Sequence, residues 1–144
     1  MNLENEHNII TSRLQKIERC RKRIIDVYDN DPKSLEDYTK QDSIILNIQR
    51  ACQACIDVSM HIVAINKWGI PQNSRDTFTL LVENNIISKG LGENLKAMVG
   101  FRNIAVHDYQ TVSIKVVQKI IEIHLDDLIK FTTTIIKDEI VWKV

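Results

Sequence analysis

The segment from Arg102 to Tyr109 carries side chains that could bind an anion and move a proton. It reads Arg102-Asn103-Ile104-Ala105-Val106-His107-Asp108-Tyr109. A guanidinium keeps its charge and can hold an oxyanion through two hydrogen bonds, and an imidazole gives or takes a proton near neutral pH. The phenol adds a hydroxyl that can be modified. We therefore expect a functional site in this segment.

The residues before this segment predict that Arg102 lies on the buried side of a helix. Leu91, Leu95 and Met98 follow one another at steps of four and three, and Ala105 continues the row. This spacing is typical of the apolar stripe of a helix, and Arg102 lies within the stripe. A cation there costs free energy unless an anion or several acceptor atoms surround it. The alternative is structural: Arg102 caps its own helix end or pairs with a carboxylate.

Beyond Ala105 the helical spacing stops, which suggests that the chain leaves the helix there. If residues 106–109 are extended, His107 and Tyr109 point to the same side, because side chains alternate along such a backbone. The cation, the imidazole and the phenol would then lie close together. The alternative is that His107 and Tyr109 only complete the core.

The elements that must position this segment are helices. Long amphipathic stretches with short connections predict an all-α fold, an antiparallel bundle of four or five helices forming one domain over residues 1–144. The expected helices cover residues 3–27, 34–38 (short) and 42–68, a third capped by Asn73 or Ser74, a fourth capped by Ser88 that delivers Arg102, and 112–140.

The composition narrows the function classes. With 44% hydrophobic and 26% charged residues but only four Gly and two Pro, the chain is typical of an ordered helical protein. Its net charge is zero, so contact with a nucleic acid would depend on local charge. We find no apolar run long enough for a membrane span and no signal peptide at the polar start, and we expect a cytoplasmic protein without membrane contact.

The number and spacing of the cysteines predict buried structural residues rather than a metal site or a redox pair. Cys52 and Cys55 form a C-x-x-C, and Cys20 stands alone. Zinc would need two further ligands, and a redox dithiol usually begins a helix after a strand. Free cysteine is among the most buried residue types, so we expect a structural role and no metal site.

Two further charged groups leave a choice open. Asp57 and His61 stand one turn apart on the long second helix, either next to the Arg102 site or as an ordinary surface pair. Basic residues crowd the first helix between positions 13 and 23, with Glu18 as the only acid among them. They could contact RNA phosphates or an acidic partner, or form a solvated face.

The Arg102–Tyr109 segment resembles the R-x4-H-x-Y motif of HEPN proteins of the HEPN–MNT toxin–antitoxin type. All specified positions match. The likeness covers about residues 5–140 and includes the stretch 51–61, Pro71, the stretch 78–81 and the lead-in Met98-Val99-Gly100-Phe101.

This resemblance implies a toxin that is a metal-independent endoribonuclease, built as a two-fold homodimer with its active cleft between subunits. Arg102 would stabilise the charge on the phosphate, and His107 of each subunit would act as base or acid. Asn103 would orient the scissile group or its neighbours, and the product would carry a 2′,3′-cyclic phosphate. Independently of the resemblance, the helix face that carries Asp57 would border this site or a subunit interface, with Asp57 as a supporting acceptor.

The resemblance also implies regulation at Tyr109. An MNT-type nucleotidyltransferase antitoxin would transfer AMP from ATP to this hydroxyl, adding bulk and negative charge beside Arg102. ATP and Mg²⁺ would belong to the antitoxin, so we expect no cofactor in this chain.

Two other functions fit the same residues. The chain could be a non-catalytic helical module that docks a nucleotidyltransferase and presents nucleotide or RNA, with Arg102 as a phosphate clamp. It could also be a structural dimer in which Arg102 and His107 only specify packing. Cleavage by highly purified protein separates the first function from both alternatives.

Overall fold

The structure, a computed structural model, describes residues 2–143 and is helical throughout. The helices are α1 (Leu3–Tyr28), α2 (Tyr38–Asn66), α3 (Ser74–Glu83), α4 (Lys89–His107), α5 (Ile114–Lys119) and α6 (Leu125–Lys137). Short 3-10 helices lie at Pro32–Glu36 and Tyr109–Thr111, and a π-helical turn joins α5 to α6 at Ile120–His124. The all-α prediction is confirmed, and the described residues contain no strand.

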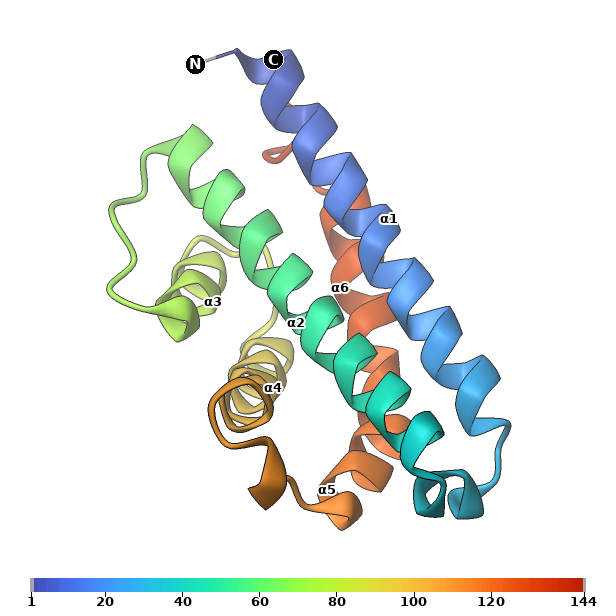
Figure 1. Cartoon of the computed structure of the whole chain (residues 1–144). Coiled ribbons are helices and arrows are strands. Elements are labelled where there is room, and N and C mark those ends of the chain that lie inside the picture. Colours follow the sequence, from blue (N-terminus) through green and yellow to red (C-terminus); the bar gives the residue numbers. More distant parts are fainter. Residues whose placement is uncertain (1, 144) are drawn as a thin grey trace.

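The helices pack as an antiparallel bundle around α2. In Figure 1, α1 and α2 run side by side in opposite directions, and α6 lies behind them. On the other side of α2, α3 and α4 pack against each other and against α2, and α4 is seen almost end-on. The helix that carries the Arg102 motif is therefore held by both α2 and α3.

Side-chain caps set the starts of the helices that build the site. The Asn73 side chain accepts the amide of Asp76 at 3.0 Å at the start of α3, and Ser88 accepts the amide of Leu91 at 3.1 Å at the start of α4. Both positions agree with the sequence prediction. The long second helix begins at Tyr38, four residues earlier than predicted, because Asp37 caps it.

The last predicted helix, 112–140, is shorter and interrupted. It runs from Ile114 to Lys137 and contains the π turn. Such a turn adds one residue to the helix and shifts the register of the residues after it. Ile120 and Ile121, the first two residues of the turn, are both buried in the core.

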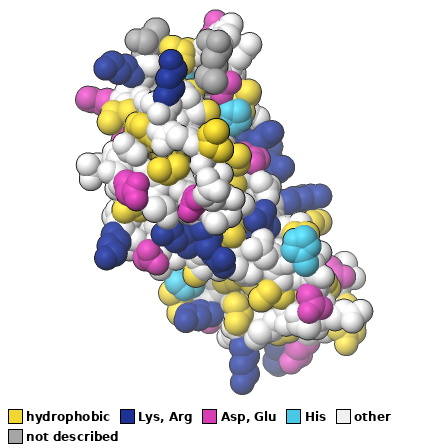
Figure 2. Space-filling model, turned by 90° about the vertical axis from the view of Figure 1, so that its left-hand side faces the viewer, with side chains coloured by type: hydrophobic (Ala, Val, Ile, Leu, Met, Phe, Trp, Pro, Cys, Tyr) yellow, Lys and Arg dark blue, Asp and Glu magenta, His cyan; other side chains and the backbone are white. Residues whose placement is uncertain are grey.

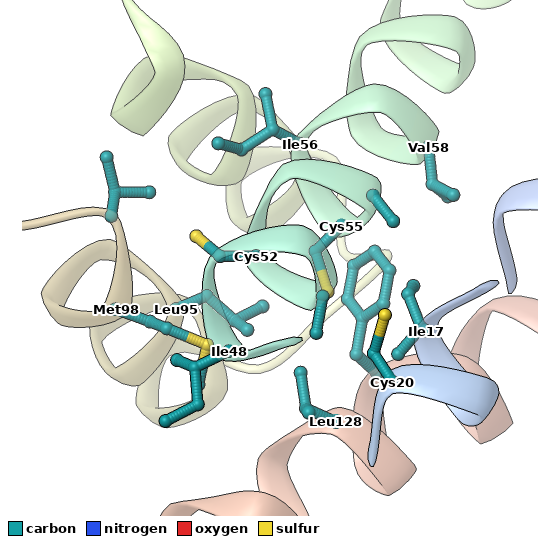
Figure 3. Close-up of a cluster of buried hydrophobic side chains, with 14 of the residues drawn as sticks. Ile17, Cys20, Ile48, Cys52, Cys55, Ile56, Val58, Leu95, Met98 and Leu128 are labelled. Atoms are coloured by element: carbon teal, nitrogen blue, oxygen red, sulfur yellow. The ribbon is translucent and has the colours of Figure 1, made fainter. Parts of the chain in front are cut away.

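The three cysteines belong to the hydrophobic core, as predicted. Cys20, Cys52 and Cys55 are free and buried, and Figure 3 shows their sulfur atoms among aliphatic side chains of α1, α2, α4 and α6. Burial raises the pKa of the Cys52 thiol to about 12 and that of Cys55 well above its usual value. These thiols are therefore protonated and structural.

Residues 2–143 hold neither a cluster of metal ligands nor a membrane-spanning helix. Three or more histidine, cysteine or acidic side chains nowhere gather as they would around a metal ion. In the same range, no helix has the length and apolar character that crossing a membrane requires.

Candidate active site

Arg102 is half-buried between α2 and α3 and is held by neutral groups. Its Nη1 donates to the side-chain oxygen of Gln53 at 2.6 Å, and its Nη2 donates to the Ser74 hydroxyl at 3.2 Å. Its Nε is buried and has no partner among the described residues. The guanidinium is thus held by uncharged acceptor atoms. Within residues 2–143, Arg102 neither pairs with a carboxylate nor caps its own helix. Because its partners are uncharged, the positive charge remains available to a ligand.

Asp57 reaches Arg102 only through Gln53. The Gln53 amide donates to Asp57 Oδ1 at 3.0 Å, and Asp57 Oδ2 forms an ion pair with Arg13 Nε at 3.3 Å. The carboxylate therefore fixes the orientation of the Gln53 amide, while Arg13 balances its charge. The expected surface pair between Asp57 and His61 is absent, since the His61 ring pairs instead with Glu6 at 2.6 Å.

His107 is the last residue of α4, which corrects the predicted extended path. The helix continues through Val106, and the amide of Asp108 still donates to the carbonyl of Ile104 at 2.8 Å. The His107 side chain is exposed, and its ring forms no hydrogen bond within residues 2–143. The imidazole is therefore open to a ligand or to a second copy of the chain.

Asn103 lies four residues before His107, on the same face of α4. It is half-buried, and its side-chain amide forms no hydrogen bond among the described residues. An amide in this position can donate to and accept from a bound group.

Figure 2 shows the face formed by α3 and α4, on which Lys and Arg side chains gather across the middle with hydrophobic side chains above and below them.

Tyr109 points away from Arg102 within one chain. Its hydroxyl donates to Asp42 in the first turns of α2, whereas Arg102 is bonded to Gln53 on the same helix. Eleven residues separate these two α2 positions, which is about 16 Å along the helix. The expectation that Tyr109 lies beside Arg102 is therefore wrong for a single chain, because the 3-10 turn after Asp108 directs the phenol toward the start of α2.

The environment of Tyr109 keeps its hydroxyl protonated. Burial, followed by the hydrogen bond to Asp42 and the charge of that carboxylate, raises the pKa of Tyr109 to about 12. The ring borders an open groove of about 440 Å³. The other residues that line this groove are Tyr38, Gln41, Asp42, Ile45, Gln110, Val112 and Ile114.

The basic residues of α1 do not form one uncompensated patch. Arg13 pairs with Asp57, and Arg21 pairs with Glu18, the only acid among them. The hydrogen bond and charge of Arg21 lower the pKa of Glu18. Arg13 is therefore connected to Arg102 through Asp57 and Gln53, and its charge is already balanced.

Sequence reasoning missed three residues that contact the motif: Gln53, Ser74 and Asp42. The sequence could have indicated Gln53, because it lies one turn before Asp57 on the same helix and side chains at that spacing can interact. The sequence pattern indicated only a helix cap at Ser74. It indicated only the start of the second helix at Asp42, and no spacing in the sequence connects that residue with Tyr109.

Comparison with known proteins shows the family to which this chain belongs. Residues 13–135 match the family described as ribonuclease HepT-like. Over 129 residues the chain is 49% identical to the mRNA nuclease HepT of Shewanella oneidensis, and the alignment covers 90% of this chain and 97% of that protein.

Solved structures extend the similarity to the fold. A tri-AMPylated Shewanella oneidensis HEPN toxin in complex with its MNT antitoxin is 47% identical, with a TM-score of 0.87 over 96% of this chain and all of that one. A toxin–antitoxin complex with AMP-PNP matches with the same TM-score over 91% of this chain and 99% of that one. The resemblance seen in the sequence is confirmed, and the chain belongs to the ribonuclease HepT-like family.

Proposed function

We propose that this chain is the toxin of a toxin–antitoxin pair and cuts RNA as an endoribonuclease. The observation that supports this most directly is the set of partners of the Arg102 guanidinium, which among residues 2–143 are the uncharged side chains of Gln53 and Ser74. On the same helix, His107 is exposed and has a free ring. Cleavage of a phosphodiester without a metal ion needs a cation to stabilise the charge on the phosphate and an imidazole to transfer protons.

The reaction assigned to these groups is an intramolecular transesterification of the RNA phosphodiester. A base removes the proton of the ribose 2′-hydroxyl, the oxygen attacks phosphorus, and the bond to the 5′-oxygen breaks as an acid protonates it. Arg102 stabilises the charge that develops on the phosphate oxygens, and Asn103 orients them. The products are a 2′,3′-cyclic phosphate and a free 5′-hydroxyl.

One chain supplies one motif histidine, whereas this reaction uses a base and an acid. We propose a two-fold homodimer, in which the two His107 rings share one groove and divide these roles. The exposure of His107 fits an interface position. Each chain contributes as a single domain, since one hydrophobic core contains residues from Ile10 to Val141.

We assign inhibition of the toxin to modification of Tyr109. An MNT-type nucleotidyltransferase would bind ATP and Mg²⁺ and transfer AMP to the phenol oxygen, releasing pyrophosphate, and the groove beside Tyr109 would receive the nucleotide. The AMP-modified toxin among the solved structures supports this assignment. Because about 16 Å of α2 separates the partners of Tyr109 and Arg102, more than one AMP, or contact across the dimer, would be needed to obstruct Arg102. We place both proteins in the cytoplasm.

The decisive experiment compares wild-type protein with His107→Ala on a defined RNA in the presence of a chelator. We expect wild-type cleavage to persist and the variant to lose at least about a hundredfold in rate, since acid–base catalysis typically contributes that much. His61→Ala serves as the control, because it removes an imidazole from α2 that is paired with Glu6. Full cleavage by folded His107→Ala protein would refute the assignment, and no cleavage by wild-type protein would favour the binding-module alternative.

A further inference from the structure

Arg75 is a second guanidinium next to the site, at a position where its positive charge does not stabilise its own helix. It is the second residue of α3, where a positive charge opposes the helix dipole. Its side chain is exposed and forms no ion pair among residues 2–143. It is nevertheless oriented, because its Nε donates to the backbone carbonyl of Lys96 on α4 at 3.3 Å.

Gly100 provides the space that this orientation requires. A Cβ atom at Gly100 would lie 2.9 Å from Arg75 Nη2, closer than real Cβ contacts allow. Glycine is a poor helix former in a helix interior, so its presence in the middle of α4 lowers helix stability. The consequence is that the Arg75 guanidinium can lie directly against the α4 backbone.

Arg75 packs against the face of α4 that carries Asn103 and His107. Gly100, Asn103 and His107 follow one another at steps of three and four, which places them on one side of the helix. The rise from Gly100 to His107 is about 10 Å. The neighbour of Arg75 in the chain, Ser74, accepts a hydrogen bond from Arg102. The second cation therefore lies beside the Arg102 end of the proposed active site, and the α4 face that it contacts continues to His107.

We propose that Arg75 is a substrate-binding residue that holds a backbone phosphate of the RNA next to the one that is cut. The proposal rests on the proposed function. A guanidinium with a fixed orientation and no carboxylate partner is suited to bind a phosphate through two hydrogen bonds. A phosphate beside the scissile one fixes the register of the strand but does not take part in bond breaking.

The first experiment measures binding of a short single-stranded RNA in which every 2′-hydroxyl is methylated, so that cleavage is impossible. We expect Arg75→Ala to weaken binding about tenfold and to reduce the slope of log affinity against log salt by about 0.7, the value for one phosphate contact on a single strand. On cleavable RNA, KM should rise by a similar factor while kcat stays within about twofold. An unchanged salt slope and KM in Arg75→Ala would overturn the proposal.

A matched pair of glycine variants tests the geometry without removing the cation. Gly100→Ala should raise the melting temperature, because alanine favours the helix, yet weaken RNA binding by displacing the guanidinium. Gly90→Ala adds the same methyl group to α4 at a position with nothing within 4 Å, and should leave binding unchanged. Wild-type affinity in Gly100→Ala would overturn the role of Gly100.

These outcomes are separate from the test of the proposed function. If wild-type protein cuts RNA and Arg75→Ala retains the wild-type salt slope, the inference fails and the proposed function stands. If wild-type protein binds the methylated RNA through Arg75 but cuts no RNA, the proposed function fails. The phosphate contact of Arg75 then stands, and its place beside a scissile phosphate is overturned.

Discussion

The Arg102 guanidinium donates a 2.6 Å hydrogen bond to the side-chain oxygen of Gln53, whose amide donates in turn to Asp57 at 3.0 Å. The order Arg102, Gln53, Asp57 determines which groups contact the guanidinium charge directly. Asp57 is close enough to orient the amide, but a neutral group separates the carboxylate from the guanidinium. The site thus combines a fixed orientation with an undiminished positive charge.

Gln53→Glu should inactivate the enzyme by neutralising this cation. The new carboxylate would pair with Arg102 and lie next to Asp57, so phosphate would have to displace it. We expect kcat/KM for RNA cleavage to fall at least about tenfold, equivalent to about 1.4 kcal/mol. The matched control is Gln49→Glu, which introduces the same charge one turn earlier on α2. Equal activity in both variants would contradict this role of Gln53.

Asp42→Asn should slow AMP transfer to Tyr109 without affecting RNA cleavage. The Tyr109 pKa of about 12 means that the phenol is protonated at neutral pH, and Asp42 is the group placed to accept its proton. Asparagine still accepts a hydrogen bond but is not a base, so we expect transfer to slow about tenfold to a hundredfold.

The measurement is the intact mass of the toxin over time with antitoxin, ATP and Mg²⁺. Asp108→Asn removes the same charge from an exposed residue beside Tyr109 and serves as the control. Tyr109→Phe should gain no mass in multiples of AMP. Mass gain at the wild-type rate in Asp42→Asn would show that another group takes the proton.

Stability should fall at alkaline pH, and Tyr28 should contribute to the loss. Tyr28 is buried and donates to Glu122 at 2.5 Å, and burial followed by this hydrogen bond raises its pKa from 10.0 to about 12. Below pH 10 the phenol is neutral in both the folded and the unfolded state. Between pH 10 and 12 the unfolded state loses the proton first, so the folded state is progressively destabilised as pH rises.

Denaturant titrations at several pH values measure this effect. Tyr28→Phe should lower stability at neutral pH by about 1 to 2 kcal/mol, because Glu122 loses a donor, and should flatten the decline above pH 10. Tyr38→Phe, at a ring that is 79% exposed, is the control and should change neither value. A decline of wild-type steepness in Tyr28→Phe would contradict the prediction.

The buried thiols should be inert in the native protein. Because burial raises the pKa of Cys52 and Cys55, little thiolate is present at neutral pH, and alkylation should proceed only after unfolding. Mass spectrometry before and after denaturant measures this directly. The double variant with alanine at both positions should retain its kcat/KM for RNA, whereas a loss of cleavage in a folded variant would indicate a chemical role.

Periodicity and motif spacing predicted most of the fold. The apolar row leading to Arg102, the caps at Asn73 and Ser88, and the burial of the cysteines all follow from local rules. The π turn at Ile120–His124 was not predicted, because no residue type or spacing in the sequence marks it. The end of α4 was misplaced because Val106 and His107 are exposed and so do not continue the buried apolar stripe.

The motif residues of the candidate site were also named from sequence, but their partners were not. Gln53, Ser74 and Asp42 contact the motif from α2 and α3, so only the packing of the bundle brings them close. The same limit explains why helical spacing pairs Asp57 with His61, whereas both side chains bind residues of α1. A sequence read without relatives gives side-chain types and helical faces, whereas contacts between distant segments come from the three-dimensional structure.

Arg102 is attached to the middle of α2 and Tyr109 to its start, and this separation has a genetic consequence. Helix α2 keeps Arg102 and Tyr109 at a fixed separation, so a substitution next to one of them leaves the surroundings of the other unchanged. Strains could therefore carry a toxin that kills but escapes its antidote, or one that accepts the nucleotide label but is harmless. Such separable alleles would let toxicity and its control be studied one at a time.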